Sequence, residues 1–199
     1  MAKWLNDLGI TVFMLKYRTV HSEGDNPMAG LFSLFTKDST ETWQKMNEVA
    51  HLAGQDGLKA MEYVRSHSKE YNLDTNKLGL LGFSAGGSVV LSVLYQAEEK
   101  NRPDFAAAIY TSDFNTNNKM APSYKVPIFL AAASDDSLGL TPVSITTYQK
   151  WIKAKQSAEL HIYEKGGHGF ALKKQNLSSD SWTCSFEEWL RLNKIIPTN

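Results

Sequence analysis

The chain has 199 residues, of which 42% are hydrophobic, and its 21 Lys and Arg residues are balanced by 21 Asp and Glu residues. This length and composition predict one globular domain, residues 1–199. The absence of a basic surplus argues against nucleic acid as a partner. The longest apolar run, residues 126–133, is far shorter than the roughly 20 residues of a membrane-spanning helix, so we expect no membrane partner. The N-terminus lacks the apolar core of a signal peptide, which makes the cytoplasm the default localisation.

Short apolar runs alternate with segments of helical spacing along the whole chain. The runs predict five strands, at residues 10–17, 77–83, 105–112, 126–134 and 158–165. The helical spacing falls on residues 46–64, 89–94, 148–152 and 186–192. This order predicts an α/β fold, in which a mostly parallel sheet carries helices on both faces.

One long stretch of the chain, residues 21–44, has no clear periodicity. Residues 21–44 include Phe32, Phe35 and Trp43, and we expect a loop or short-helix excursion near a pocket there. The single cysteine, Cys184, excludes an internal disulfide and is expected to be buried or half-buried.

The segment Gly82-Phe83-Ser84-Ala85-Gly86 lies between a predicted strand and a predicted helix. It matches the G-x-S-x-G nucleophile elbow, in which a sharp turn holds the serine in a strained conformation at a helix N-terminus. We expect Gly82 and Gly86 to crowd each other, so that neither position accepts a side chain. The alternative is a glycine-rich turn that only packs the strand against the helix.

A serine nucleophile needs a base, and the base needs a carboxylate that orients it. Of the two histidines that follow Ser84, His168 lies in a glycine-rich loop after the last strand, whereas His161 lies within that strand, so His168 is favoured. For the acid, Asp136 is favoured over its neighbour Asp135. Asp113 and Asp104 are alternatives that follow or precede an earlier strand.

The segments GFSAGG, SDDSLGL and AELHIYEKGGHGF together resemble the α/β-hydrolase superfamily, and within it the bacterial esterase and acetyl-xylan-esterase-like branch. The resemblance covers nearly the whole chain, and it supports Asp136 as the acid. It also implies a buried structural ion pair between Arg18 and Asp56 beneath the site. Trp182 and Trp189 are expected to be core residues that hold the His168 loop.

The resemblance implies a truncated α/β-hydrolase fold, because the first three strands of the superfamily have no counterpart before residue 10. The Ala85 N–H would be one oxyanion donor, and the loop that usually supplies the second donor also has no counterpart. We therefore expect either that residues 10–17 pair directly with residues 77–83, or that the chain forms a homo-oligomer.

These features predict a serine carboxylic-ester hydrolase that acts on short acyl groups, with acetyl esters of carbohydrate favoured. Ser84 would be the nucleophile, His168 the base, Asp136 the orienting acid and Ala85 the oxyanion donor, without any metal or organic cofactor. A small-molecule or carbohydrate ester would be the substrate. The alternatives are a peptidase or lactone hydrolase on the same scaffold, and a weakly active or inactive binding or assembly domain.

Overall fold

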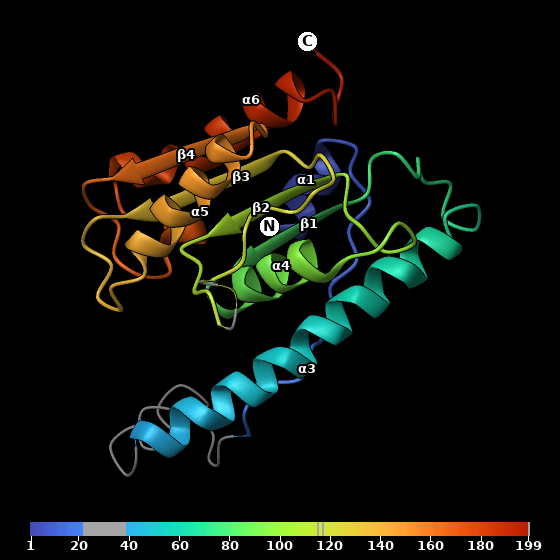
Figure 1. The fold of residues 1–199 in the computed structure, drawn as a ribbon. Coiled ribbons are helices and arrows are strands. Elements are labelled where there is room, and N and C mark those ends of the chain that lie inside the picture. The colour runs from blue at the N-terminus through green and yellow to red at the C-terminus, as the bar shows by residue number, and fades with distance from the viewer. Residues whose placement is uncertain (22–38, 115, 117, 199) are drawn as a thin grey trace.

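The computed structural model describes residues 1–21, 39–114, 116 and 118–198. Its centre is a parallel sheet of four strands in the order β1-β2-β3-β4 (Figure 1). The strands are β1 (Gly79–Phe83), β2 (Phe105–Ile109), β3 (Ile128–Ala133) and β4 (Ala158–Tyr163). The predicted parallel sheet with helices on both faces is therefore confirmed.

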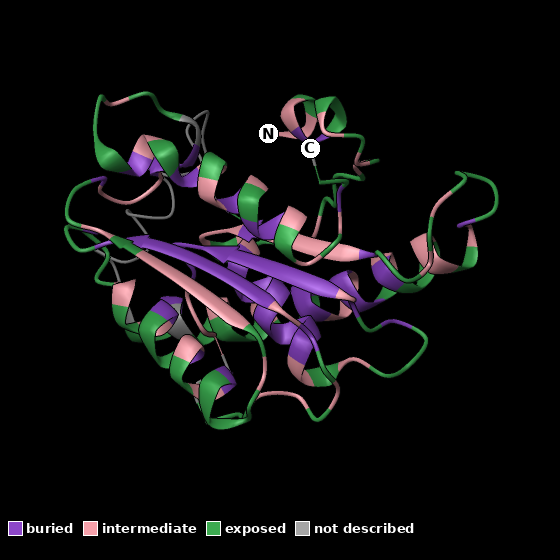
Figure 2. Cartoon of the chain, turned by 90° about the horizontal axis from the view of Figure 1, so that it is seen from above, coloured by how far each residue is buried: buried purple, intermediate pink, exposed green. Residues whose placement is uncertain are grey.

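The two central strands explain the continuous apolar runs in the sequence. Every residue of β2 and β3 is buried, whereas the outer strands β1 and β4 are mostly half-buried (Figure 2). A parallel strand covered on both faces needs apolar side chains at every position, which the alanine-rich β2 and β3 provide.

Alternate residues of these strands face two separate cores. On one face, Ala106 and Leu130 pack with the helices α4 (Ala85–Gln96) and α5 (Thr141–Lys153). On the other face, Ala107 and Phe129 pack with α1 (Ala2–Asp7) and α6 (Trp182–Leu192). The aromatic residues of α6 dominate this second core.

Trp182 and Trp189 of α6 are core residues, as predicted, with exposures of 1% and 2%. The Trp182 indole N–H donates a hydrogen bond to the Ala171 carbonyl at 2.6 Å. Ala171 belongs to the short helix η1 (Phe170–Leu172), which follows the His168 loop, and η2 (Ser178–Ser181) leads from there into α6. The expectation for Cys184 is wrong, because this residue of α6 is exposed.

The longest helix, α3 (Ser39–Ser66), lies on the outer side of α4 (Figure 1). Residues 39–44, which were expected in a loop or short helix, form its first turns, and residues 22–38 of that prediction lie outside the described residues. None of the helices in the described part of the chain has the length and apolar character needed to cross a membrane.

The predicted strand at residues 10–17 is not formed. In the described chain, residues 11–20 make no backbone-to-backbone hydrogen bond, and β1 pairs only with β2. The apolar pattern still directs Val12 into the core beneath α6 and Tyr17 toward the α3–α4 side. The segment is thus placed by its side chains, but it lacks the neighbouring backbone that defines a strand.

Candidate active site

Ser84 is the residue at which β1 turns into α4. Its backbone has φ 51° and ψ −120°, a left-handed conformation that a residue with a side chain rarely adopts. The Ser84 N–H donates to the Ile109 carbonyl of β2 at 3.0 Å, while Gly87 and Ser88 N–H groups donate to the Ser84 carbonyl. Sheet and helix therefore hold the strained residue from both sides, which leaves its hydroxyl at the carboxyl end of the sheet.

The glycines around Ser84 have unequal roles. A Cβ on Gly82 would lie 2.1 Å from the Gly86 carbonyl oxygen, so only glycine fits there. A Cβ on Gly86 would come no closer than 3.7 Å to any neighbour, the Tyr17 hydroxyl, so the expectation that Gly86 also excludes a side chain is wrong. The crowded position on the helix side is Gly87, where a Cβ would lie 2.5 Å from the Thr111 hydroxyl oxygen.

His168 reaches Ser84 from the loop that follows β4. Its Nε2 lies 2.8 Å from Ser84 Oγ. Gly167 and Gly169, on either side of it, have φ of +66° and +82°, so the loop turns through two left-handed residues to bring the imidazole over the sheet edge.

Tyr110, directly after β2, contacts the His168 ring edge-on at a centroid distance of 5.0 Å. Burial raises the pKa of Tyr110 to about 12, so its phenol is neutral at ordinary pH. The sequence reasoning missed this contact. The signal that could have found it is position, because Tyr110 ends a strand beside β1 and so shares a sheet edge with Ser84.

Asp136 accepts the second hydrogen bond of the histidine. Its Oδ2 lies 3.0 Å from His168 Nδ1, and its side chain is fully buried. The other carboxylate oxygen accepts the Leu138 N–H at 2.8 Å. An ionised carboxylate can only accept, so the ring proton lies on Nδ1 and Nε2 is free to accept the Ser84 hydroxyl proton.

The alternative residues have other partners. His161, within β4, bonds through Nε2 to Glu159 at 2.7 Å. Asp135 accepts the Gly167 N–H at 2.7 Å. Asp104 accepts the Leu78 N–H at 2.9 Å. Asp113 is half-buried and lies close enough to Lys150 that this cation opposes the rise that burial causes in its pKa. The structure thus brings together Ser84, His168 and Asp136 and none of these four.

Ala85 is the first residue of α4 and is exposed beside Ser84. The first N–H groups of a helix have no partner within the helix, and the helix dipole adds partial positive charge there. The Ala85 N–H is therefore the type of donor that could bind an oxyanion formed beside Ser84.

A separate cavity of about 280 Å³ lies between α3, α4 and the loop after β2. Its lining includes His51, Tyr95 and Lys119.

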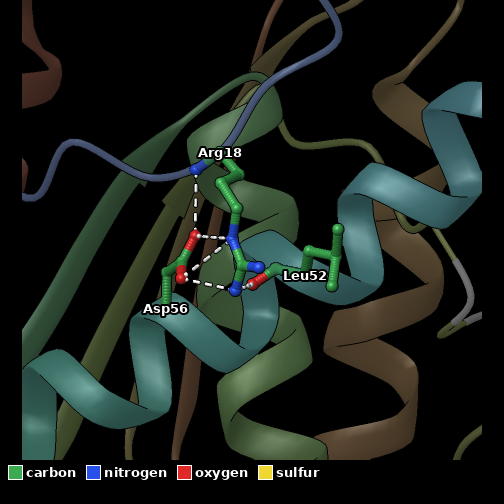
Figure 3. Close-up of polar contacts among 3 residues, drawn as sticks. All are labelled: Arg18, Leu52 and Asp56. Atoms are coloured by element: carbon green, nitrogen blue, oxygen red, sulfur yellow. Dashed lines mark hydrogen bonds and ion pairs between the residues drawn. The ribbon is translucent and has the colours of Figure 1, made fainter.

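The expected contact between Arg18 and Asp56 is present (Figure 3). The Arg18 guanidinium bonds both carboxylate oxygens, through Nη2 at 2.7 Å and Nε at 2.9 Å, and its backbone N–H donates to the same carboxylate. The hydrogen bonds from Arg18 hold the pKa of Asp56 below its ordinary value. The expected burial is wrong, because the Arg18 side chain is 50% exposed and the Asp56 side chain 20%. The pair ties the N-terminal segment to α3.

A parallel sheet between helices, with a strained serine at the strand-to-helix turn and a histidine after the last strand, defines the α/β-hydrolase fold. The sequence profile of the dienelactone hydrolase family matches residues 31–195, and the chain belongs to this family. The predicted resemblance to the α/β-hydrolase superfamily is thereby confirmed.

Individual proteins similar to the chain include two named esterases and one named bifunctional hydrolase. An acetylxylan esterase of Xylanibacter ruminicola is 22% identical over 94% of the chain, and the match spans 40% of that protein. An acetyl ester-xyloside bifunctional hydrolase from Caldicellulosiruptor lactoaceticus superposes with a TM-score of 0.74 and 24% identity, covering 98% of this chain and 76% of that one. An esterase of Thermogutta terrifontis superposes with a TM-score of 0.63 and 16% identity, covering 75% and 67%. The chain thus spans less than half the length of the curated relative that it matches.

Proposed function

We propose that this chain carries the catalytic machinery of a serine carboxylic-ester hydrolase. The observation that supports the proposal is a chain of two hydrogen bonds, one between Ser84 and His168 and the other between His168 and Asp136. Each side chain comes from the carboxyl end of a different strand, which is where α/β sheets bind their ligands.

In the first half of the reaction, Ser84 Oγ attacks the ester carbonyl carbon while His168 Nε2 takes the hydroxyl proton. The buried Asp136 carboxylate stabilises the imidazolium that results. The carbonyl oxygen becomes an oxyanion, and the Ala85 N–H at the α4 N-terminus donates to it. The C–O bond to the alcohol then breaks as His168 returns its proton to the leaving oxygen, which leaves an acyl-Ser84.

In the second half, water replaces the alcohol. His168 Nε2 takes a proton from the water, whose oxygen attacks the acyl carbon, and collapse of the second intermediate returns the proton to Ser84 Oγ as the carboxylic acid leaves. Neither half needs a redox partner or a cofactor, because ester hydrolysis changes no oxidation state and His168 Nε2 carries each proton.

The substrate class we propose is short acyl esters, with acetyl esters of carbohydrate favoured. The support is the resemblance of the triad segments to the acetyl-xylan-esterase-like branch and the activities in the names of the two similar proteins that cover nearly the whole chain. The name of the family itself points to a second candidate, ring opening of a lactone, which uses the same serine chemistry on a cyclic ester.

The test is hydrolysis of p-nitrophenyl acetate by the wild type and by Ser84→Ala, with Ser137→Ala as a matched control for an exposed serine. We expect Ser84→Ala to abolish turnover and a fluorophosphonate probe to label the wild type at Ser84, whereas Ser137→Ala keeps full activity. Comparison of acetyl, butyryl and octanoyl esters with a lactone separates the substrate classes. A wild type that neither hydrolyses any of these nor reacts with the probe would contradict the proposal and favour the binding or assembly domain.

A further inference from the structure

The turn after β3 directs two adjacent carboxylates to the same loop. Asp136 N–H donates to the Ala133 carbonyl at 3.1 Å, which closes the turn directly after the strand. Asp136 Oδ2 then bonds the His168 ring, whereas Asp135 Oδ1 accepts the backbone N–H of Gly167 at 2.7 Å. The Asp136 carboxylate therefore orients the imidazole, and the Asp135 carboxylate contacts the backbone of the residue that precedes His168.

A second side chain holds the other end of the same peptide unit. Gln175 Nε2 donates to the Gly166 carbonyl at 3.0 Å. The carbonyl of Gly166 and the N–H of Gly167 belong to one planar group, so Asp135 and Gln175 together fix the orientation of that plane. Gln175 is in turn fixed, because its own N–H and that of Asn176 donate to the Asp180 carboxylate, at 2.9 Å and 2.7 Å.

The orientation of this plane matters because of the residue that follows it. Gly167 has φ +66° and no atom within 4 Å of its Cβ position, so neither a side chain of its own nor a neighbour at that position restricts its rotation. Rotation about the Gly167 N–Cα bond moves the whole of His168 relative to the sheet. A hydrogen bond of 2.8 Å to Ser84 tolerates little such movement, and a misplacement of about 1 Å can cost up to about 10²-fold in rate.

We propose that Asp135 and Gln175 are positioning residues, which clamp the Gly166–Gly167 peptide unit and thereby hold His168 Nε2 on Ser84. The inference rests on the proposed function. It assigns to Asp135 a role separate from that of Asp136, because Asp135 acts through the backbone and needs only an acceptor oxygen, not a charge.

The experiment compares Asp135→Ala, Asp135→Asn and Gln175→Ala with Ser137→Ala, an exposed residue of the same loop, in p-nitrophenyl acetate hydrolysis. We expect Asp135→Ala to lower kcat by about tenfold with KM unchanged, since the loop loses one hydrogen bond to a charged group. Asp135→Asn keeps the acceptor oxygen and should recover most of this loss. Gln175→Ala should lower kcat in the same way and serves as the test if Asp135→Ala does not fold.

Hydrogen exchange of the Gly167 amide gives a readout that does not depend on activity. We expect faster exchange in Asp135→Ala and wild-type exchange in Asp135→Asn. Wild-type kcat and exchange in Asp135→Ala would overturn the inference, as would an Asp135→Asn variant as slow as Asp135→Ala. If the wild type has no esterase activity but Gly167 still exchanges faster in Asp135→Ala than in the wild type, the proposed function is contradicted. The hydrogen-bonding role of Asp135 at the Gly166–Gly167 peptide unit is then still supported.

Discussion

The carbonyl oxygen of Gly86 lies 2.1 Å from where a Cβ on Gly82 would stand, so the elbow closes only because residue 82 has no side chain. We expect Gly82→Ala to shift the elbow, abolish esterase activity and lower the free energy of unfolding by about 1–3 kcal/mol, the usual cost of forcing an atom into a packed site. Urea unfolding with parallel activity assays measures both effects.

Gly86→Ala is the matched control, because its Cβ would meet no atom closer than 3.7 Å. It should unfold at the wild-type urea concentration or slightly above it. Equal stability losses in the two variants would show that the close contact at Gly82 does not govern the turn.

Removing the charge at Asp136 should affect catalysis more than stability. In Asp136→Asn the amide can donate to His168 Nδ1, which favours the wrong tautomer and leaves Nε2 unable to accept the Ser84 proton. In a serine protease with the same triad this change lowers kcat by about 10⁴, and we expect a loss of that order here. Steady-state kinetics with p-nitrophenyl acetate give the measurement. Since His161 Nε2 bonds to Glu159 in the described chain, His161→Ala should keep most of the activity, and a comparable loss there would reopen the choice of base.

The proposed nucleophile and base could be chosen from the sequence because their positions follow from local rules. A serine between glycines at a strand end, and a histidine in a glycine loop after the last strand, both fall at the carboxyl edge of a parallel sheet. For the acid, the residues alone favoured Asp136 over Asp135 without fixing the choice, and the family resemblance supported Asp136. Both carboxylates lie on one turn, and what separates them is the course of a loop some thirty residues later.

Other features required long-range information that no local pattern holds. Residues 10–17 have the composition of a strand, but a strand exists only beside a hydrogen-bonded neighbour, and β1 is not that neighbour. The pairing of Arg18 with Asp56 was implied by the family resemblance, whereas its exposure depends on how α3 lies over α4. Tyr110 was overlooked because its contact with His168 arises only once β2 lies beside β1.

The Arg18–Asp56 pair predicts a small dependence of stability on acid. Hydrogen bonds from Arg18 lower the pKa of Asp56 in the folded state, so this carboxylate stabilises the fold above its unfolded pKa. That stability is lost as the pH falls through the lowered folded pKa. Asp56→Asn should therefore lose stability relative to the wild type at pH 7 and converge with it at the acid end. The effect is modest because half of the Arg18 side chain is exposed.

Urea unfolding of both proteins between pH 7 and pH 2.5 makes this comparison. Asp7→Asn is a suitable control, since its partner Lys3 is 89% exposed and their pair should contribute little. A constant difference between the wild type and Asp56→Asn over the whole range would show that the carboxylate charge plays no part.

Trp182 should stabilise the loop that carries His168. Trp182→Phe keeps an aromatic ring in the core but removes the N–H that the buried Ala171 carbonyl accepts. An unsatisfied buried acceptor costs about 1–3 kcal/mol, and we expect the free energy of unfolding to fall by that amount. Leu192→Ala on the same helix, where the side chain is 73% exposed, should stay within about 0.5 kcal/mol of the wild type. Equal effects of the two changes in chemical unfolding would contradict the role of the hydrogen bond.

The open edge of β1 predicts association of this chain with itself. The Leu78 carbonyl and the Ser84 N–H face β2, so by strand alternation the N–H and C=O groups of Leu81 face the other way, where the described chain offers no strand. In the N-terminal segment, Phe13, Met14 and Leu15 are 42%, 87% and 40% exposed. Unpaired sheet edges and exposed apolar side chains are both sites at which chains associate. We expect the weight-average mass in sedimentation equilibrium to rise with concentration.

Charge on this segment should suppress that association. Lysine is a residue with which natural proteins block sheet edges, so Met14→Lys combined with Leu15→Lys should lower the mass toward that of one chain. Ile152→Lys, on the exposed surface of α5 far along the sheet order from β1, provides the matched control and should associate as the wild type does. A wild type that stays at 22.3 kDa at every concentration would contradict the prediction, and loss of association in the Ile152 variant would move the contact to the α5 face.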